Sequence, residues 1–198
     1  MIALSFLGEL GLIVGASLLG NNLPLTARQI LAMNVITDLL PATSVALQKP
    51  ELRNLAGLNR EGAAALDAPL RNDLFRRATA TAVPALASYL IMQGMGMPAA
   101  ASTVAFGSVI STQLAQTFMA GRSEGHLTRS VSGAVLGSGG MLVAALIVPP
   151  LRSVLDLVAP SALGWTLIGA GAPAAVLLNY LLASLHMPGT ASTPYPFA

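Results

Sequence analysis

The sequence predicts an all-α membrane protein that crosses the bilayer with six transmembrane helices. The 198-residue chain is 54% hydrophobic but only 9% charged, whereas soluble domains usually carry about 25% charged residues. Three long stretches, 78–121, 130–151 and 157–198, contain no Asp, Glu, Lys or Arg. A helix needs about 20 apolar residues to cross the hydrocarbon core of a bilayer, so these stretches have room for several spans. We therefore expect a single membrane domain over residues 1–198.

The spans are placed by their length, their apolar character and the turn-forming residues between them. They cover approximately residues 2–20, 27–47, 76–95, 100–121, 130–149 and 161–185. The first lacks the basic start of a signal peptide and is interrupted by Glu9, so a transmembrane helix fits it better. The second follows "NNLPLTA", and a turn around Met97-Pro98 separates the third from the fourth.

The remaining connections are polar or rich in turn-forming residues. The one long connection is a polar loop over 49–75, "GRSEGHLTR" precedes the fifth span, and "PPLRSVLDLVAPS" precedes the sixth. The tail 186–198 has turn composition and is expected to be loose.

The orientation of the spans is predicted from the basic residues in alternating loops. Two basic residues lie on one side, Arg28 and Arg152. Eight lie on the other: Lys49, Arg53, Arg60, Arg71, Arg76, Arg77, Arg122 and Arg129. Because cytoplasmic loops carry an excess of Lys and Arg, both termini and the 49–75 loop are expected in the cytoplasm of a multi-pass plasma-membrane protein.

Two classes of function are excluded by composition. The basic residues form no cluster with interleaved aromatic residues, so the pI near 9.5 does not indicate a nucleic-acid partner. The chain contains no cysteine, which rules out disulfides and thiolate metal sites.

Two acidic residues fall within predicted spans, Glu9 in the first and Asp38 in the second. The other six lie in loops: Glu51, Glu61, Asp67, Asp73, Glu124 and Asp156. A charged group at the centre of a bilayer costs roughly 2.5–3.5 kcal/mol even on permissive scales, and such groups are usually functional. The sequence places no Lys or Arg at the same depth, so these two acids need either protons or a bound cation.

The residues around Asp38 favour the cation. Asn34 and Asp38 are spaced i and i+4, with Thr37 between them, so their oxygens share a helix face. Pro41 has no N–H and leaves the carbonyl of Thr37 without its helical donor, which should bend or unwind the helix. Carboxylate, amide, hydroxyl and carbonyl oxygens suit a hard cation, and unwound helices at mid-membrane often bind ions. Helix–helix hydrogen bonds, or a protonated Asp38, are the alternatives.

Other polar and small residues are weaker signals. Gln113 and Gln116, at i and i+3 of the fourth span, favour interhelical hydrogen bonding from spacing alone. The pairs "GLIVG" at Gly11 and Gly15 and "GAVLG" at Gly133 and 137 match small-xxx-small patterns and predict close helix packing.

The stretch "PLTARQILAMNVITDLLPATSVALQKPE" closely resembles the sixth transmembrane helix of type-II P-type cation ATPases, the calcium-pump-like group, with the connection that precedes it. Weaker resemblances run through "DAPLRNDLFRR", "STVAFGSVISTQLAQTFMAGRSE" and "VPPLRSVLDLVAPSALGW". The resemblance implies that the six spans correspond to the last six of the family's ten helices.

The resemblance also implies a set of cation ligands. Asn34, Thr37 and Asp38 match the family's sixth-helix ligands, and Glu9 matches the fifth-helix glutamate. Two positions depart from the pattern, because Phe6 stands where the family has an asparagine ligand and Gln113 stands where it has an acidic one. One divalent ion such as Ca2+ or Mg2+ is therefore expected, bound by Glu9, Asn34, Thr37, Asp38 and Gln113.

The chain lacks the catalytic sequence motifs of such a pump. The phosphorylated D-K-T-G-T motif, the nucleotide-binding domain, the actuator T-G-E loop and a Gly-rich phosphate loop do not occur in it. ATP and its Mg2+ would act only through those missing domains, so we expect a fragment whose partners are the lipid bilayer, the cation and the missing N-terminal part. A stand-alone proton-coupled secondary carrier and a non-transporting membrane remnant remain as alternatives.

Overall fold

The computed structural model describes residues 2–19, 23–39, 68–123 and 129–185. The regular elements formed by these residues are all helices, with no strand among them, which confirms the predicted all-α class. The elements are α1 (Ile2–Leu18), α2 (Ala27–Asn34), η1 (Val35–Leu39), α4 (Ala68–Gly94), α5 (Pro98–Ser123), α6 (Arg129–Ile147), α7 (Pro149–Val154) and α8 (Ala162–Leu185).

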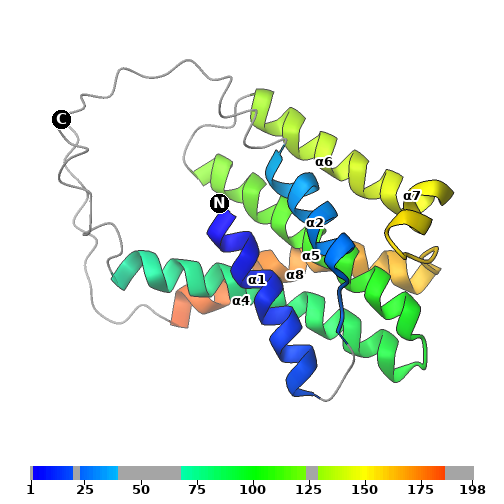
Figure 1. Cartoon of the computed structure of the whole chain (residues 1–198). Coiled ribbons are helices and arrows are strands. Elements are labelled where there is room, and N and C mark those ends of the chain that lie inside the picture. Colours follow the sequence, from blue (N-terminus) through cyan, green and yellow to red (C-terminus); the bar gives the residue numbers. More distant parts are fainter. Residues whose placement is uncertain (1, 20–22, 40–67, 124–128, 186–198) are drawn as a thin grey trace, which may run out of the picture.

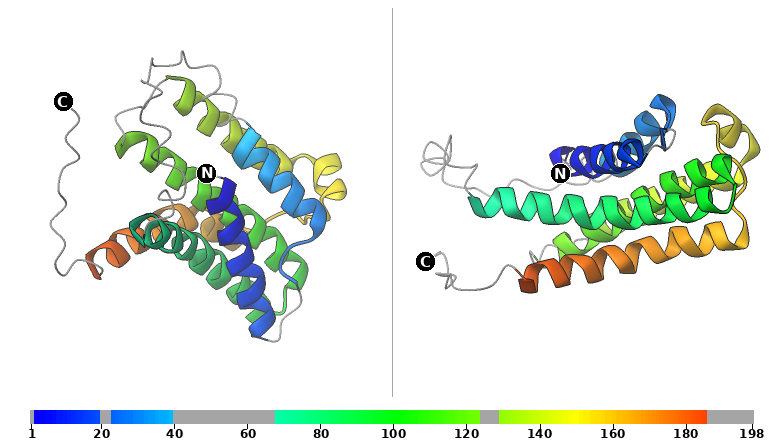
Figure 2. Two further views of the ribbon diagram at one scale, coloured as in Figure 1. Left: turned by 60° about the vertical axis from the view of Figure 1, so that its left-hand side comes forward. Right: turned by 90° about the horizontal axis from the view of Figure 1, so that it is seen from below.

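Helix α5 lies at the centre of the bundle, with α1 and α2 on one side of the α4–α5 layer and α8 on the other (Figures 1 and 2). Its buried side chains alternate between apolar residues such as Phe106 and Ile110 and polar ones such as Thr112 and Gln113. A central helix of this kind is covered on most sides, so it can place polar groups where α1, α4 and η1 meet it.

Glycines bring α1 against α4. A Cβ added at Gly8 would lie 2.9 Å from Thr81 Cγ2, and one at Gly15 would lie 2.8 Å from Leu86 Cδ2. Side chains at these positions would separate the two backbones, as expected for small-xxx-small packing. The close packing predicted at Gly15 is thus confirmed. At Gly133 an added Cβ would meet nothing within 4 Å among the described residues, so the prediction is wrong for that glycine within this part of the chain.

The second predicted span is helical from Ala27, but it is not a uniform α-helix. It changes to a π-helix at Val35–Leu39, and the predicted remainder, 40–47, lies outside the described residues. The predicted local departure from α geometry is therefore present, at the segment that carries Asp38. Single π turns inside helices occur frequently at functional sites.

The start of α2 is fixed by the side chain of Gln29. Gln29 Oε1 accepts from the backbone N–H of Thr26 at 3.0 Å, completing a capping box, and from Ser102 Oγ of α5 at 3.1 Å. Gln29 Nε2 donates to the carbonyl of Leu155 at 3.0 Å. A fully buried glutamine thus ties α2 to α5 and to the connection between α7 and α8.

Two helices, α4 and α7, differ from the prediction. Helix α4 begins at Ala68, inside the predicted loop, where Asp73 pairs with Arg76 and with Arg77 one turn later; i,i+3 and i,i+4 pairs of this kind support helical turns. The short helix α7 lies in the connection before α8 and begins with Pro149, a residue suited to the first turn of a helix.

The described helices differ in their apolar character. Ala162–Ser184 is the one candidate within the described ranges that is both long and apolar enough to cross a membrane, and 17% of it is buried. Phe6–Leu18 and Ser132–Ile147 are apolar but shorter. The other long helices, α4 and α5, are rich in Ser, Thr, Gly and Gln, so six membrane-crossing helices stay a prediction.

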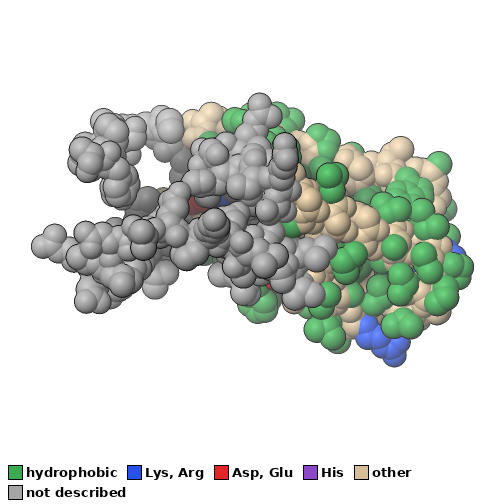
Figure 3. All heavy atoms as spheres, turned by 90° about the horizontal axis from the view of Figure 1, so that it is seen from above, with side chains coloured by type: hydrophobic (Ala, Val, Ile, Leu, Met, Phe, Trp, Pro, Cys, Tyr) green, Lys and Arg blue, Asp and Glu red, His purple; other side chains and the backbone are tan. Residues whose placement is uncertain are grey.

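Large apolar side chains are exposed on several helices. Leu31 is 67% exposed, Leu136 is 76% exposed and Leu177 is 60% exposed. Figure 3 shows apolar side chains spread over the described part of one face, with few charges among them. Exposed apolar surface on this scale marks contact with a partner or a membrane.

Candidate functional site

Glu9 of α1 is buried within the bundle, with 2% of its surface exposed. Its side chain is hydrogen-bonded to Gln113 of α5, and Asp38 of η1 lies close enough to repel a negative charge on it. The Oε1 atom of Glu9 is buried and has no hydrogen-bond partner among the described residues. Three elements thus bring two carboxyl groups and one amide to the same place.

The η1 segment adds a hydroxyl group beside Asp38. Thr37 is 3% exposed, and its Oγ1 donates to the carbonyl of Met33 at 3.0 Å. That bond uses the hydroxyl proton and leaves a lone pair of the oxygen available. Asp38 of η1 and Asn34 at the end of α2 are partly buried.

The backbone of this segment is held by Ser138 of α6, whose Oγ donates to the carbonyl of Ile36 at 2.5 Å. In a π-helix each carbonyl accepts from the residue five positions later. For Ile36 and Thr37 these residues are Pro41 and Ala42, which lie outside the described residues, so the open carbonyl predicted at Thr37 stays a prediction.

The role of Ser138 could not be predicted from the sequence. It lies in an apolar helix without an acidic or amide neighbour, and a lone serine in such a helix is not distinctive. Its role appears only when α6 and η1 are packed together, and the two are in contact.

The predicted site residues therefore fall into two groups. Glu9, Asp38 and Gln113 come together from α1, η1 and α5, while Thr37 precedes Asp38 in η1 and Asn34 is the last residue of α2, directly before η1. No group of three or more His, Cys, Asp or Glu side chains suited to a metal occurs in the part of the chain that the structure describes. Among the described residues, the ligands on offer here are the carboxyl groups of Glu9 and Asp38 together with neutral oxygens.

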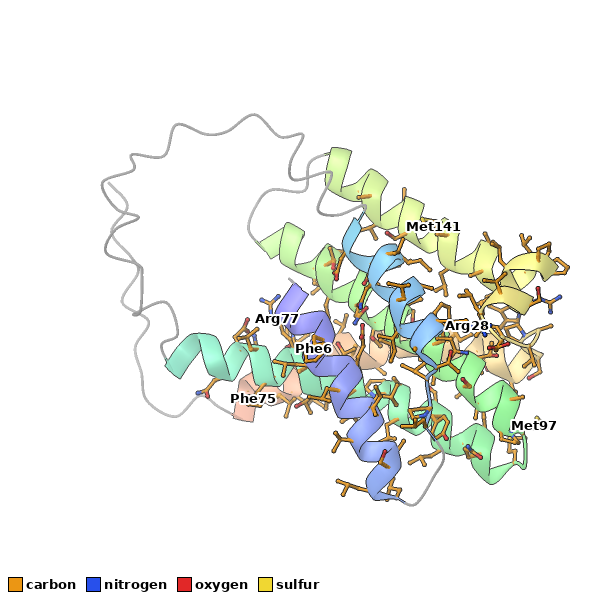
Figure 4. The ribbon with its side chains drawn as sticks, in the orientation of Figure 1. Phe6, Arg28, Phe75, Arg77, Met97 and Met141 are labelled. Atoms are coloured by element: carbon orange, nitrogen blue, oxygen red, sulfur yellow. The ribbon has the colours of Figure 1, made fainter. Side chains whose placement is uncertain are left out.

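Phe6 does not contribute to this site. It lies one turn before Glu9 on α1 and is 61% exposed (Figure 4). The oxygen that the family resemblance would place there is replaced by an outward apolar ring.

Gln116 behaves as the interhelical hydrogen-bonding interpretation predicts. Its Nε2 donates to Thr81 Oγ1 at 2.8 Å and to the carbonyl of Arg77 at 3.1 Å, both on α4. Gln113, one turn earlier on the same helix, points instead to Glu9. Two glutamines with the same spacing signal thus have different roles, one between helices and one in the candidate site.

The chain is similar to cation-transporting ATPases in two comparisons with known proteins. A family model described as "Cation transporting ATPase, C-terminus" matches residues 22–185. A calcium-transporting ATPase of Bacillus subtilis (strain 168) is 28% identical over 175 residues, which cover 83% of this chain and 19% of that relative. The chain therefore spans about a fifth of the relative's length.

Proposed function

Because this chain belongs to the family formed by the C-terminal region of the cation-transporting ATPases, we propose that it supplies the membrane ligands for the cation in such a pump. The proposal rests chiefly on one observation. Glu9, Gln113 and Asp38, from three different elements, meet inside the bundle.

The proposed ligands are Glu9, Asn34, Thr37, Asp38 and Gln113. They offer two carboxylates, two amide oxygens and one hydroxyl oxygen, the oxygen donors that hard divalent ions bind. Two negative charges balance one divalent ion, and the buried Oε1 atom of Glu9, which has no hydrogen-bond partner among the described residues, has an acceptor lone pair to offer it. We assign one cation, with Ca2+ ahead of Mg2+ because the matched relative is a calcium-transporting ATPase.

The proposed setting is a multi-pass plasma-membrane domain over residues 1–198, with six membrane-crossing helices and both termini in the cytoplasm. The exposed leucines of α2, α6 and α8 would face lipid. In this setting the chain is one fragment of a pump, and the parts that bind ATP and form the aspartyl phosphate would be supplied by a missing N-terminal part.

The packing supports a way to change cation affinity. Helices α1 and α2 lie on one side of the α4–α5 layer, and α1 contacts α4 through glycines. A small displacement of α1 or η1 would move Glu9 or Asp38 away from Gln113 and open the cation site. Cytoplasmic domains that pull on α1 and η1 would therefore switch affinity without disturbing α5.

The test is Asp38→Asn in the pump that contains this chain, with Asp73→Asn as the control. Asp38→Asn should abolish cation-dependent phosphorylation by ATP, because one of the two carboxylates is lost. Asp73→Asn removes a carboxylate that pairs only with Arg76 and Arg77 among its described neighbours and should leave the dependence intact. Unchanged cation dependence in Asp38→Asn would refute the ligand assignment.

One feature favours a second candidate, a proton-coupled secondary carrier. Glu9 and Asp38 are close enough to interact, and two neighbouring carboxyl groups can share a proton. The purified chain in liposomes separates the candidates, since transport driven by a proton gradient without ATP would favour the carrier.

A further inference from the structure

A second polar region begins one turn after Gln113 on α5, at a cavity of about 230 Å³ between α4, α5 and α8 that Gln116 lines. Its charged lining comes from Arg76 and Arg77 near the start of α4, and Figure 4 shows Arg77 at the opposite end of that helix from Met97. Both arginines are partly exposed, at 27% and 30% of their side chains. Their shared partner Asp73 offsets one of the two positive charges, so the group keeps a net charge of about +1.

The neutral lining has two buried oxygen atoms that lack a donor. Gln116 Oε1 and Asn179 Oδ1 are both buried and have no hydrogen-bond partner among the described residues. The orientation of the Gln116 amide is fixed, because its Nε2 donates to the carbonyl of Arg77, which can only accept. Gln116 itself is 6% exposed. Both residues line the cavity, and buried acceptors without donors are costly, so a ligand donor that reaches these oxygens would offset that cost.

The rest of the lining is apolar or amphipathic. Met119 of α5 lines the cavity, and so does Tyr180 of α8, which is 61% exposed. The cavity thus joins a cationic end, two acceptor oxygens and an apolar wall that continues to the surface of α8. An anionic phosphodiester with hydroxyl groups and an attached acyl chain has all three complementary features.

We propose that this cavity binds the headgroup of an anionic glycerophospholipid, of which phosphatidylglycerol is the simplest case. The phosphodiester accepts from the arginines, which bind phosphate through charge-assisted hydrogen bonds, and the glycerol hydroxyls donate to Gln116 Oε1 and Asn179 Oδ1. The acyl chains follow the exposed apolar side of α8. Basic pockets between membrane helices on the cytoplasmic side are suited to such headgroups, and the predicted orientation puts Arg76 and Arg77 on that side.

The chemistry of the headgroup predicts how strongly different phospholipids bind. Phosphatidylglycerol has both the negative charge and the donors, phosphatidylethanolamine has donors but no net charge, and phosphatidylcholine has neither. The purified chain in detergent should therefore retain phosphatidylglycerol about tenfold more strongly than phosphatidylcholine, as native mass spectrometry measures, which is the loss expected for one charge-assisted hydrogen bond. Equal retention of the two lipids would overturn the proposal.

Two variants on different helices test the site itself. Arg76→Gln removes a phosphate donor and Asn179→Leu removes an acceptor, and each should reduce phosphatidylglycerol retention about tenfold towards the phosphatidylcholine level. Arg152→Gln on α7, outside the cavity lining, is the control and should retain the lipid. Unchanged retention in both cavity variants would refute the site, and if one variant fails to fold the other and the wild-type lipid comparison still decide.

A soluble competitor separates a lipid from a free phosphate ester. Glycerol 3-phosphate shares the phosphate and hydroxyl chemistry but has no acyl chain. At millimolar concentration it should not displace phosphatidylglycerol, and displacement would assign the cavity to a free phosphate ester and overturn the lipid proposal. Both measurements are independent of the cation, so Asp38→Asn should bind the lipid normally even if the proposed pump function fails.

Discussion

Glu9 of α1 and Gln113 of α5 are hydrogen-bonded inside the helix bundle. The bond joins an acid to a neutral amide that donates to it, and no positive charge is supplied by either helix at this point. This bond fixes the position of the Glu9 side chain, while its Oε1 atom has no hydrogen-bond partner among the described residues and can serve as a cation ligand.

We expect Glu9→Gln to separate cation binding from folding. Glutamine keeps the size of the side chain and removes the charge that Asp38 repels, so the cation-free chain should become more stable. A gain of 1 kcal/mol corresponds to a rise of about 2–4 °C in Tm for a chain of this size. Circular dichroism in detergent measures the transition with and without CaCl2.

The decisive measurement is the effect of calcium on the Tm of each protein. A ligand that binds only the folded state raises Tm with concentration, so calcium should raise the Tm of the wild type but not that of Glu9→Gln. An equal calcium-dependent rise in both proteins would show that Glu9 is not a ligand.

Gln113→Glu should make the chain more dependent on calcium. A third carboxylate facing Glu9 and Asp38 adds like-charge repulsion when no ion is present, and adds a charged ligand when calcium is bound. We expect a lower Tm without calcium and a steeper rise as calcium is added, with affinity increased about tenfold, or 1.4 kcal/mol.

Gln116→Glu is the matched control on the same helix. It removes the donor that bonds Thr81 and the Arg77 carbonyl and should lower Tm whether or not calcium is present. A similar calcium response in the two variants would argue against a specific role of Gln113.

Much of the fold could be predicted from sequence, because the long uncharged stretches have few alternatives to helices. The two acids of the candidate site could also be found, since Glu9 and Asp38 are the acids that fall inside apolar segments. A local change of helix geometry could also be predicted where a single residue causes it. Pro41 indicated a departure from α geometry near Asp38, and η1 is that departure.

Features that depend on which helix faces meet could not be predicted. In α6 the exposed Leu136 and the buried Leu142 are the same residue type, so apolar character does not show which face packs inward. For the same reason the small-xxx-small pattern predicted close packing correctly at Gly15, where Leu86 of α4 lies close. It was wrong at Gly133, where no atom of the described residues lies within 4 Å of an added Cβ. The bond between Ser138 and Ile36 joins residues far apart in the chain, and only tertiary packing brings them together.

Glycine packing in α1 gives a prediction with an internal control. Gly15→Leu would force a side chain into Leu86 of α4, whereas Gly133→Leu would place one in open space. Overpacking of this kind costs typically 1–3 kcal/mol, so Gly15→Leu should lower Tm by roughly 2–12 °C and also weaken calcium binding by moving α1.

Gly133→Leu should leave Tm within about 2 °C of the wild type, as expected for a surface substitution. The same circular dichroism measurement compares the two variants. If both glycines tolerate leucine equally, α1 does not pack against α4 as closely as the structure shows.

Ser138→Ala tests the support of the η1 backbone. The change removes the hydroxyl that donates to the carbonyl of Ile36, and the loss of a buried hydrogen bond costs about 0.5–1.5 kcal/mol. Because the carbonyl precedes Thr37 and Asp38 directly, we expect faster amide hydrogen exchange over 35–39 and weaker calcium binding together with a lower Tm.

Ser153→Ala is the control. It removes an exposed hydroxyl that donates within its own turn, to the carbonyl of Pro150, and should change neither the exchange, nor the calcium binding, nor the Tm. A Ser138→Ala protein that loses stability but keeps wild-type exchange over 35–39 would show that the bond stabilises α6 packing without holding the cation-binding segment.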